Sequence, residues 1–307
     1  MTREELFERL ARLKTAPVGG RRAPHKPLLL LWLFGRYAET GSTAVTYADA
    51  EEPVSRLIND FGPSVVSVTA QRQRAAMPFV HLERTLWQLL DGSEQPIGSG
   101  APERGNWLRS HGAVGRLRPE VELLLSDPGT LAAAVRVLLD RHFTPALEPL
   151  VCEGAGLDLT SLEEAAYALA PRTPRRRTRR SGFAEEALRA YAFACAMCGY
   201  DGALGRNPVG LQAAHIRWHS QDGPDEVRNA LALCALHHAL LDLGVLGLTL
   251  DMRIRVSGLY VARNEAGRAV DALAGQLLAA PRPGNPPVDP AFITWHDRQV
   301  FKHPAAA

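Results

Sequence analysis

The feature that most constrains this chain is a pair of metal-ligand spacings between residues 195 and 238. Cys195 and Cys198 form a C-x2-C pair, and Cys234 and His237 repeat the same spacing further along. Zn²⁺ prefers thiolate and imidazole ligands, and two such pairs brought together by a turn complete a tetrahedron. The sequence therefore predicts a structural zinc site at these residues. The alternative, buried cysteines that pack as small apolar side chains, leaves the repeated spacing unexplained.

Three further polar residues interleave with these pairs: His215, Asn229 and His238. This order resembles that of the HNH nucleases, whose site is a ββα-metal hairpin and helix, and the resemblance covers about residues 183 to 250. It implies that His215 is the general base, that Asn229 orients the hairpin or the base, and that His238 is a ligand of the catalytic metal. Hydrolysis of a phosphodiester needs a proton acceptor that titrates near neutrality and a divalent cation such as Mg²⁺ or Mn²⁺.

One position departs from the HNH pattern. Many HNH sites have Asp or His immediately before the general base as a second metal ligand, and this chain has Ala214 there. Asp242 follows His238 at the i+4 position, so on a helix both would share a face and could hold one ion. Otherwise phosphate and water complete the coordination, and Asp242 is a surface carboxylate at a helix end. His219 has no paired partner nearby and is expected to be a solvated loop histidine.

Composition limits the cellular setting. The chain has 307 residues, enough for two ordinary domains, and its net charge is only +2. The first residues show no signal-peptide pattern, and the longest apolar run, residues 27–34, is far short of the ~20 residues of a membrane span. With three cysteines assigned to zinc, only Cys152 remains, which favours a reducing compartment over a disulfide framework. We expect a cytoplasmic protein without membrane contact.

A change in composition divides the chain. Residues 166–181 are rich in arginine and proline, including Arg175, Arg176 and Arg177, and have the composition of a linker. Their charge predicts contact with a DNA backbone, whereas a solubilising spacer is the alternative. The expected class is α+β: a mainly helical DNA-binding domain with short strands at 1–165, and a zinc-containing ββα-metal domain at 182–307.

The first domain carries basic segments at its expected turns. Residues 19–27 form a basic turn before an apolar helix, whose start favours anions. Residues 71–74 alternate Gln and Arg in an expected loop, the side chains that read adenine and guanine in a major groove. Residues 94–118 are expected to form one long loop. Solvated cationic loops are the alternative. We expect DNA contacts from Arg22, His25, Lys26, Gln71, Arg72, Gln73, Arg74, Arg104 and Arg109.

Two short segments of the first domain carry a second resemblance. Residues 22–30 read RAPHKPLLL and residues 77–79 read MPF. Both are similar to segments in the sulfur-binding domains of McrA-like, phosphorothioate-DNA-dependent restriction endonucleases, although Met77 stands where an aromatic residue is common. The order of sulfur-binding domain, linker and HNH domain matches too. The resemblance implies binding of double-stranded DNA in which sulfur replaces one non-bridging phosphate oxygen.

The physical basis of such recognition is the weak hydration of sulfur. A shallow apolar cup favours sulfur, whereas an oxyanion desolvated there without donors is costly. Pro78, Phe79 and Val80 are predicted to form the cup, with charge supplied by His25, His81 or Arg109. The alternative for Pro78 and Phe79 is plain core packing.

The leading hypothesis is a type IV-like, modification-dependent restriction endonuclease that binds phosphorothioated DNA and cuts nearby. A double-strand break would need a homodimer or two molecules acting on the two strands. One alternative is an HNH nuclease whose first domain reads a methylated base or plain sequence. The other is a zinc-stabilised DNA-binding protein without catalysis, which Ala214 permits.

Overall fold

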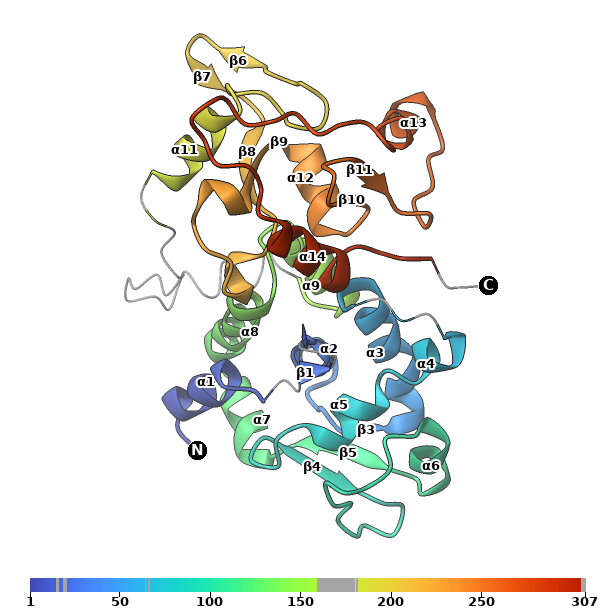
Figure 1. The fold of residues 1–307 in the computed structure, drawn as a ribbon. Coiled ribbons are helices and arrows are strands. Elements are labelled where there is room, and N and C mark those ends of the chain that lie inside the picture. The colour runs from blue at the N-terminus through green and yellow to red at the C-terminus, as the bar shows by residue number, and fades with distance from the viewer. Residues whose placement is uncertain are drawn as a thin grey trace. The chain divides into compact units, whose positions relative to one another are not determined.

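The computed structural model describes residues 1–14, 17–18, 21–63, 65, 67–158, 180 and 182–304. The chain divides into two compact units, Met1–Pro174 and Arg175–Pro304 (Figure 1). Both units combine helices with short antiparallel strands, so the predicted α+β class is confirmed. Among the described residues, no helix is both long and apolar enough to cross a membrane.

Helices make up most of the described part of the first unit, and local signals set their ends. α1 (Arg3–Ala11) begins at a capping box, in which Thr2 and Glu5 each bond the other's backbone N–H. α2 (His25–Thr40) is largely buried and ends at Gly41, whose φ of 73° favours glycine. The other helices within the described residues are α3 (Tyr47–Phe61), α4 (Val68–Arg72), α5 (Ala76–His81), α6 (Gly105–Ser110), α7 (Pro119–Leu125), α8 (Pro128–His142) and α9 (Glu148–Gly154).

The described strands of the first unit form a two-stranded pair and a three-stranded antiparallel sheet, in which β5 (Val114–Leu117) lies between β3 (Val45–Thr46) and β4 (Trp87–Leu90). In the larger sheet, Gly115 lies against Trp87, and a Cβ at that position would come within 1.9 Å of the indole. Residues 94–118 contain a helix and a strand, so the prediction of one long loop there was wrong. The strands are β1 (Pro17–Val18), β2 (Arg21–Arg22), β3 (Val45–Thr46), β4 (Trp87–Leu90) and β5 (Val114–Leu117).

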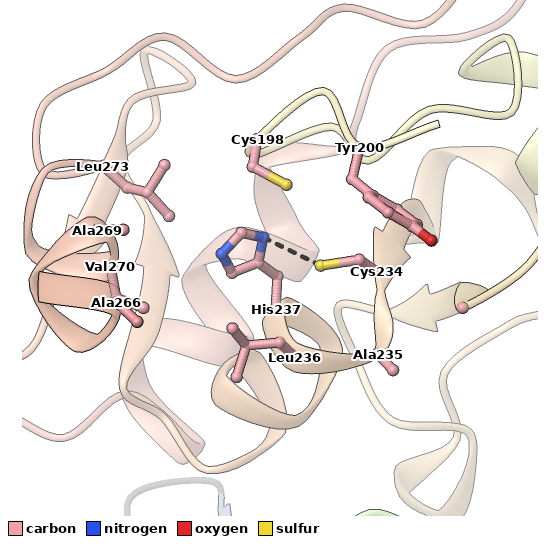
Figure 2. A pocket seen from close by; sticks show the side chains of 11 residues that line it. Cys198, Tyr200, Cys234, Ala235, Leu236, His237, Ala266, Ala269, Val270 and Leu273 are labelled. Carbon is pink, nitrogen blue, oxygen red and sulfur yellow. Dashed lines mark hydrogen bonds between the residues drawn. The ribbon is translucent and has the colours of Figure 1, made fainter. Parts of the chain in front are cut away.

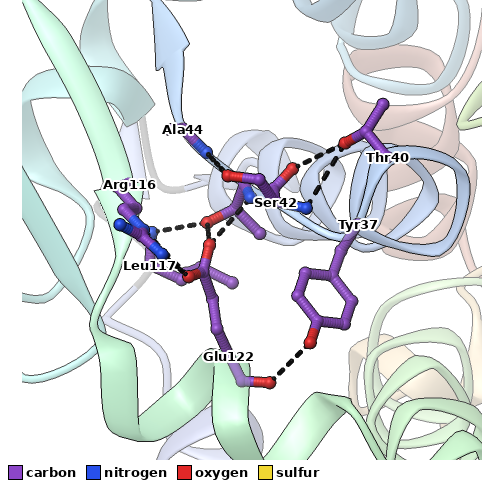
Figure 3. A network of polar contacts seen from close by, with 8 residues as sticks. Tyr37, Thr40, Ser42, Ala44, Arg116, Leu117 and Glu122 are labelled. Carbon is purple, nitrogen blue, oxygen red and sulfur yellow. Dashed lines mark hydrogen bonds and ion pairs between the residues drawn. The ribbon is translucent and has the colours of Figure 1, made fainter.

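A buried carboxylate ties three segments of the first unit together (Figure 3). Glu122 of α7 accepts hydrogen bonds from the backbone N–H and the hydroxyl of Thr43 at 2.8 and 2.6 Å, and from Nε of Arg116 at 2.8 Å. The Thr43 hydroxyl in turn accepts from the N–H of Leu117. Burial raises the pKa of Glu122, but the bonds from Arg116 and Thr43 lower it further, so the carboxyl stays ionised at neutral pH.

The second unit is built around the antiparallel hairpin of β8 (Leu211–His215) and β9 (Ala230–Cys234). Side chains alternate between its faces. On one face, Ala213 packs with Phe183 of α11 (Phe183–Ala190). On the other face, Ala214 belongs to the larger core with Leu241 of α12 (Ala235–Asp242). Figure 1 shows α11 and α12 on opposite sides of the hairpin. This is the predicted ββα arrangement.

The elements of the second unit are short. The helices are α11 (Phe183–Ala190), η1 (His219–Gln221), η2 (Val227–Asn229), α12 (Ala235–Asp242), α13 (Glu265–Asp271) and α14 (Pro290–Gln299). The strands are β6 (Ala203–Leu204), β7 (Asn207–Pro208), β8 (Leu211–His215), β9 (Ala230–Cys234), β10 (Leu246–Leu248) and β11 (Ile254–Val256). His296 fixes α14 to α12, because its Nε2 donates to the Leu241 carbonyl at 3.0 Å.

Candidate functional site

The two predicted ligand pairs, which are far apart in the sequence, lie together in one cluster of sulfur and nitrogen atoms. The thiols of Cys195, Cys198 and Cys234 and one ring nitrogen of His237 all lie within 4.8 Å of one another. His237 Nδ1 is 3.5 Å from the Cys195 sulfur and 3.4 Å from the Cys234 sulfur. Burial raises the pKa of the Cys195 thiol, but hydrogen bonds from His237 and from backbone N–H groups lower it more. The donor set fits a tetrahedral thiolate and imidazole site.

One side of this cluster opens into a pocket of about 440 Å³ (Figure 2). Cys198, Cys234 and His237 line it from the cluster side, and Val270 and Leu273 line it from the opposite side. Cys198 is exposed, whereas Cys195 is buried. The cluster is therefore held from within the unit but can be approached by small molecules from the pocket.

His215 ends β8 in a buried, polar setting. Its side chain is 5 % exposed, and its ring stacks on Phe183 with centroids 4.6 Å apart. Nε2 lies 2.8 Å from Oδ1 of Asp225. His219, expected to be a solvated loop histidine, instead faces the same carboxylate, with Nε2 3.8 Å from Oδ2. Burial raises the pKa of Asp225, but bonds from the Arg180 N–H and His215 lower it further, so the carboxylate is ionised.

Asn229 is fully buried and holds the loop that leads to Asp225. Its Oδ1 accepts from the Arg217 N–H at 2.8 Å. Its Nδ2 donates to the carbonyls of Arg217 and Pro224 at 2.9 and 3.0 Å. The backbone carbonyl of Asn229 also accepts from the Ile216 N–H. Asn229 therefore braces the connection between the two strands of the hairpin.

His238 lies on α12, on the side of the hairpin away from α11. Its Nδ1 donates to the side-chain carbonyl of Gln212 at 2.7 Å, and its Nε2 is 3.5 Å from Oδ2 of Asp242. The Asp242 side chain is only 2 % exposed, so the alternative of a surface carboxylate was wrong. Ala214, beside His215, points into the core on the α12 face of the hairpin.

The contacts of His215 and His238 form two sets. Gln212 and His215 are three residues apart on β8, and strand alternation points their side chains to opposite faces. His215 contacts Asp225 and Phe183, whereas His238 contacts Gln212 and Asp242. The convergence of both histidines on one phosphate at the end of β8 stays a prediction.

The predicted sulfur cup lies in the core of the first unit. Pro78, Phe79 and Val80 are all buried on α5. Phe79 makes edge-to-face contacts with Tyr47 and Trp87, at centroid distances of 5.2 and 5.3 Å. These side chains do not present a surface to DNA, which agrees with the core-packing alternative. The apolar contacts that hold α5 against the sheet are the physical reason.

Several predicted cationic contacts are engaged within the first unit. Lys26 pairs with Glu83 at 2.8 Å, and Arg109 pairs with Glu51. His81, one-third exposed, lies 2.6 Å from Glu103. The carboxylate in each pair partly offsets the positive charge and so weakens its attraction for a phosphate.

The Gln and Arg segment is not the open loop that the sequence suggested. Gln71 and Arg72 end α4, and Gln71 Nε2 donates to the Val65 carbonyl. Arg74 is only 8 % exposed and donates to Asn59 Oδ1 at 3.2 Å and to His25 Nε2 at 3.0 Å. Burial and the Arg74 charge lower the pKa of His25 to about 3, so His25 is neutral.

The remaining predicted contacts differ in exposure. Arg72 and Arg104 are exposed, and Gln73 is half-buried. Arg22 lies on β2, opposite Pro17. Arg175, Arg176 and Arg177 lie outside the described residues.

One family match falls in each of the two units. The family described as ScoMcrA-like, DNA sulfur-binding domain matches residues 3–160, which is half of the chain. The chain belongs to this family. A second family, described as HNH endonuclease, matches residues 195–249, so the chain also carries an HNH endonuclease domain. Both resemblances found in the sequence are confirmed.

Solved structures similar to parts of the chain carry related descriptions. The sulfur-binding domain of SprMcrA complexed with phosphorothioated DNA is 22 % identical over 52 % of this chain and 97 % of its own, with a TM-score of 0.43. The type IV phosphorothioation-dependent restriction endonuclease ScoMcrA is 24 % identical over 51 % of this chain and 32 % of its own, with a TM-score of 0.39. The modification-dependent TagI restriction endonuclease is 23 % identical over 40 % of this chain and 38 % of its own, with a TM-score of 0.31. No curated protein matches.

Asp225 was not among the site residues predicted from the sequence. It lies ten residues after His215, in the connection between β8 and β9, and carries no periodic or spacing signal. The signal that could have found it is its chemistry: a carboxylate in a glycine- and proline-containing loop between two predicted catalytic residues. Arg180 was also missed as a specific residue, although it belongs to the predicted linker.

Proposed function

We propose that this protein is a type IV-like, modification-dependent restriction endonuclease. It binds phosphorothioated double-stranded DNA through a domain at 1–165 and hydrolyses a phosphodiester nearby through a domain at 182–307, joined by a linker at 166–181. The observation that carries the proposal is the presence, on one chain, of a match to the sulfur-binding family and a match to the HNH endonuclease family.

In the proposed hydrolysis, His215 takes a proton from the attacking water, and Asn229 keeps the loop beside it in place. His238 and Asp242 would hold Mg²⁺ or Mn²⁺, since an imidazole nitrogen and a buried carboxylate oxygen 3.5 Å apart suit a divalent ion. When bound, such an ion neutralises charge on the scissile phosphate. We assign Zn²⁺ to the Cys195 cluster, where it keeps the hairpin and α12 together.

For sulfur recognition we propose the outer face of α5. Met77 and His81 are an i, i+4 pair, so they share a helix face, and both are half-buried while residues 78–80 face the core. A polarisable thioether beside a titratable imidazole suits a large, weakly hydrated sulfur that still carries negative charge. Exposed Arg72 and Arg104 would contact neighbouring phosphates.

The test compares matched duplexes that differ only in one phosphorothioate linkage. Met77→Ala and His81→Ala are expected to reduce the preference for the modified duplex. Arg104→Ala is expected to weaken binding to both duplexes alike, because a phosphate contact carries no information about sulfur. Arg141→Ala, which removes an exposed arginine of α8, is the matched control and is expected to change neither binding constant.

Cleavage assays separate the alternatives. The proposal predicts that the wild-type protein cuts the modified duplex and that His215→Ala abolishes cutting while binding is retained. Equal cutting of both duplexes would instead identify an HNH nuclease that reads a methylated base or plain sequence. Binding without cutting, under every divalent ion tried, would identify a DNA-binding protein without catalysis.

The proposal also covers assembly and compartment. A double-strand break requires two hydrolytic events on opposite strands, which we assign to a homodimer formed on DNA. Light scattering with and without the modified duplex tests this assignment, and a constant monomer mass during double-strand cutting would refute it. A cluster with three thiol ligands needs reduced cysteines, so we place the protein in the cytoplasm.

A further inference from the structure

The surroundings of His215 include a carboxylate for which the HNH pattern drawn from the sequence has no position. We propose that Asp225 is a positioning residue for His215: it accepts the Nε2 proton and thereby makes Nδ1 the atom that takes a proton from water. This inference rests on the proposed function, because it assigns the tautomer of the same base.

The hydrogen-bond geometry carries the first step. Oδ1 of Asp225 lies 2.8 Å from Nε2 of His215. A carboxylate that is ionised can only accept, so Nε2 must carry the hydrogen in this pair. In the neutral ring the lone pair then resides on Nδ1. A carboxylate that bonds one ring nitrogen in this way fixes both the tautomer and the ring orientation of a general base.

The carboxylate is itself held in place. The backbone N–H of Arg180 donates to Oδ2, and Nε of Arg180 donates to the Asp225 carbonyl at 3.2 Å. The Arg180 guanidinium also pairs with Glu186 of α11. The side chain of Asp225 is only 11 % exposed. Asp225 therefore cannot swing away from His215 without breaking contacts on two sides.

The ring is fixed from its remaining sides. Phe183 stacks on its face at a 27° interplanar angle, and His219 lies at a centroid distance of 5.7 Å. Among the residues that the structure describes, the charged or titratable groups around the pair include Arg180 and Glu186, from the start of the unit, and His219, from η1. Stacking and the Asp225 bond together leave the imidazole one orientation, so its proton-accepting atom is set before substrate arrives.

A tautomer measurement tests the inference without requiring activity. Nitrogen NMR of the full chain labelled at histidine is expected to show the Nε2-protonated form of His215, and Asp225→Asn is expected to reduce that population. The amide of Asn can also donate, which favours the opposite tautomer. A wild-type His215 protonated on Nδ1 would overturn the inference, whether or not the protein cleaves DNA.

Kinetics give the second readout. Asp225→Asn is expected to lower single-turnover cleavage by about 10- to 10⁴-fold, the range between loss of an outer partner of a metal-bound histidine and loss of the carboxylate that fixes the tautomer of a general base. Binding of the duplex should not change. The ascending limb of the pH–rate profile should move to lower pH, because a negative charge beside the base is gone. Asp225→Glu should recover part of the rate.

The control is Asp271→Asn, the same substitution at an exposed carboxylate of α13, and it should leave rate, profile and tautomer unchanged. If Asp225→Asn cuts at the wild-type rate with an unchanged profile while His215→Ala is inactive, the inference fails and the proposed function stands. If the wild-type protein never cuts, the proposed function fails, and the tautomer alone decides the inference.

Discussion

Removal of the Asn229 side chain provides a direct test of how the hairpin is held together. Asn229→Ala deletes three hydrogen bonds, made to the N–H and carbonyl of Arg217 and to the carbonyl of Pro224. Since a buried hydrogen bond contributes about 0.5–1.5 kcal/mol net, the expected loss of stability in the second unit is about 2–4 kcal/mol. No comparable loss is expected in the first unit.

The assay is native-state hydrogen exchange followed by mass spectrometry. Every 1.4 kcal/mol is about tenfold in an opening constant, so the hairpin amides should lose roughly 30- to 700-fold of their protection. Amides of the first unit serve as the internal control. The matched variant is Asn285→Ala, which removes a half-buried asparagine whose side chain makes one solvent-exposed bond to the Arg282 carbonyl. It is expected to change stability by no more than about 0.5 kcal/mol.

Two results would refute this reasoning. One is a loss of protection in Asn229→Ala no larger than in Asn285→Ala. The other is a loss spread equally over both units, which would show that Asn229 does not act locally. Cleavage should also fall, because the braced loop runs directly into Asp225.

Three further predictions concern the two units separately. Removal of zinc by a chelator is expected to unfold the second unit and leave the first unit folded, which circular dichroism would follow together with the release of zinc. If the hairpin amides stay protected against hydrogen exchange after the metal is removed, this prediction is wrong. Burial lowers the pKa of His296 to about 4, so the folded protein holds this imidazole in its neutral form. The resulting contribution to the free energy of unfolding is complete above pH 6.5 and falls by about 3 kcal/mol as the pH drops toward 4. His296→Gln keeps a donor for the Leu241 carbonyl, and its urea midpoints should lack this pH dependence. Glu122→Gln should cost about 2 kcal/mol at pH 7, because the acceptor for Arg116 and Thr43 loses its charge; an unchanged urea midpoint would show that the network is unimportant.

Local patterns predicted the second unit better than the first. The repeated spacing from Cys195 to His237 was visible because metal ligands are fixed by short intervals and by residue type. The hairpin that brings these ligands together followed from the resemblance to the HNH nucleases. Asp225 was not predicted, since its role depends on a loop path set by Asn229, and no periodicity describes a loop.

The errors in the first unit have a common physical cause. Arg74 is a buried guanidinium, which is tolerable only because Asn59 and His25 accept its hydrogen bonds, and neither partner is visible from the local sequence. Similarly, the sequence around Phe79 was equally compatible with a surface cup and with core packing. Its burial was decided by Tyr47 and Trp87, which are distant in sequence but adjacent in space.

The bonds of Arg180 have a consequence for where the protein cuts. They hold the chain that comes from the linker beside Asp225 and His215, so the segment that connects to the first unit ends next to the proposed general base. Between Asp158 and Arg180 there are 22 peptide steps, which span at most about 75 Å at ~3.4 Å each. Since duplex DNA rises ~3.4 Å per base pair, a single molecule can reach no more than about 22 base pairs from the point where Asp158 lies.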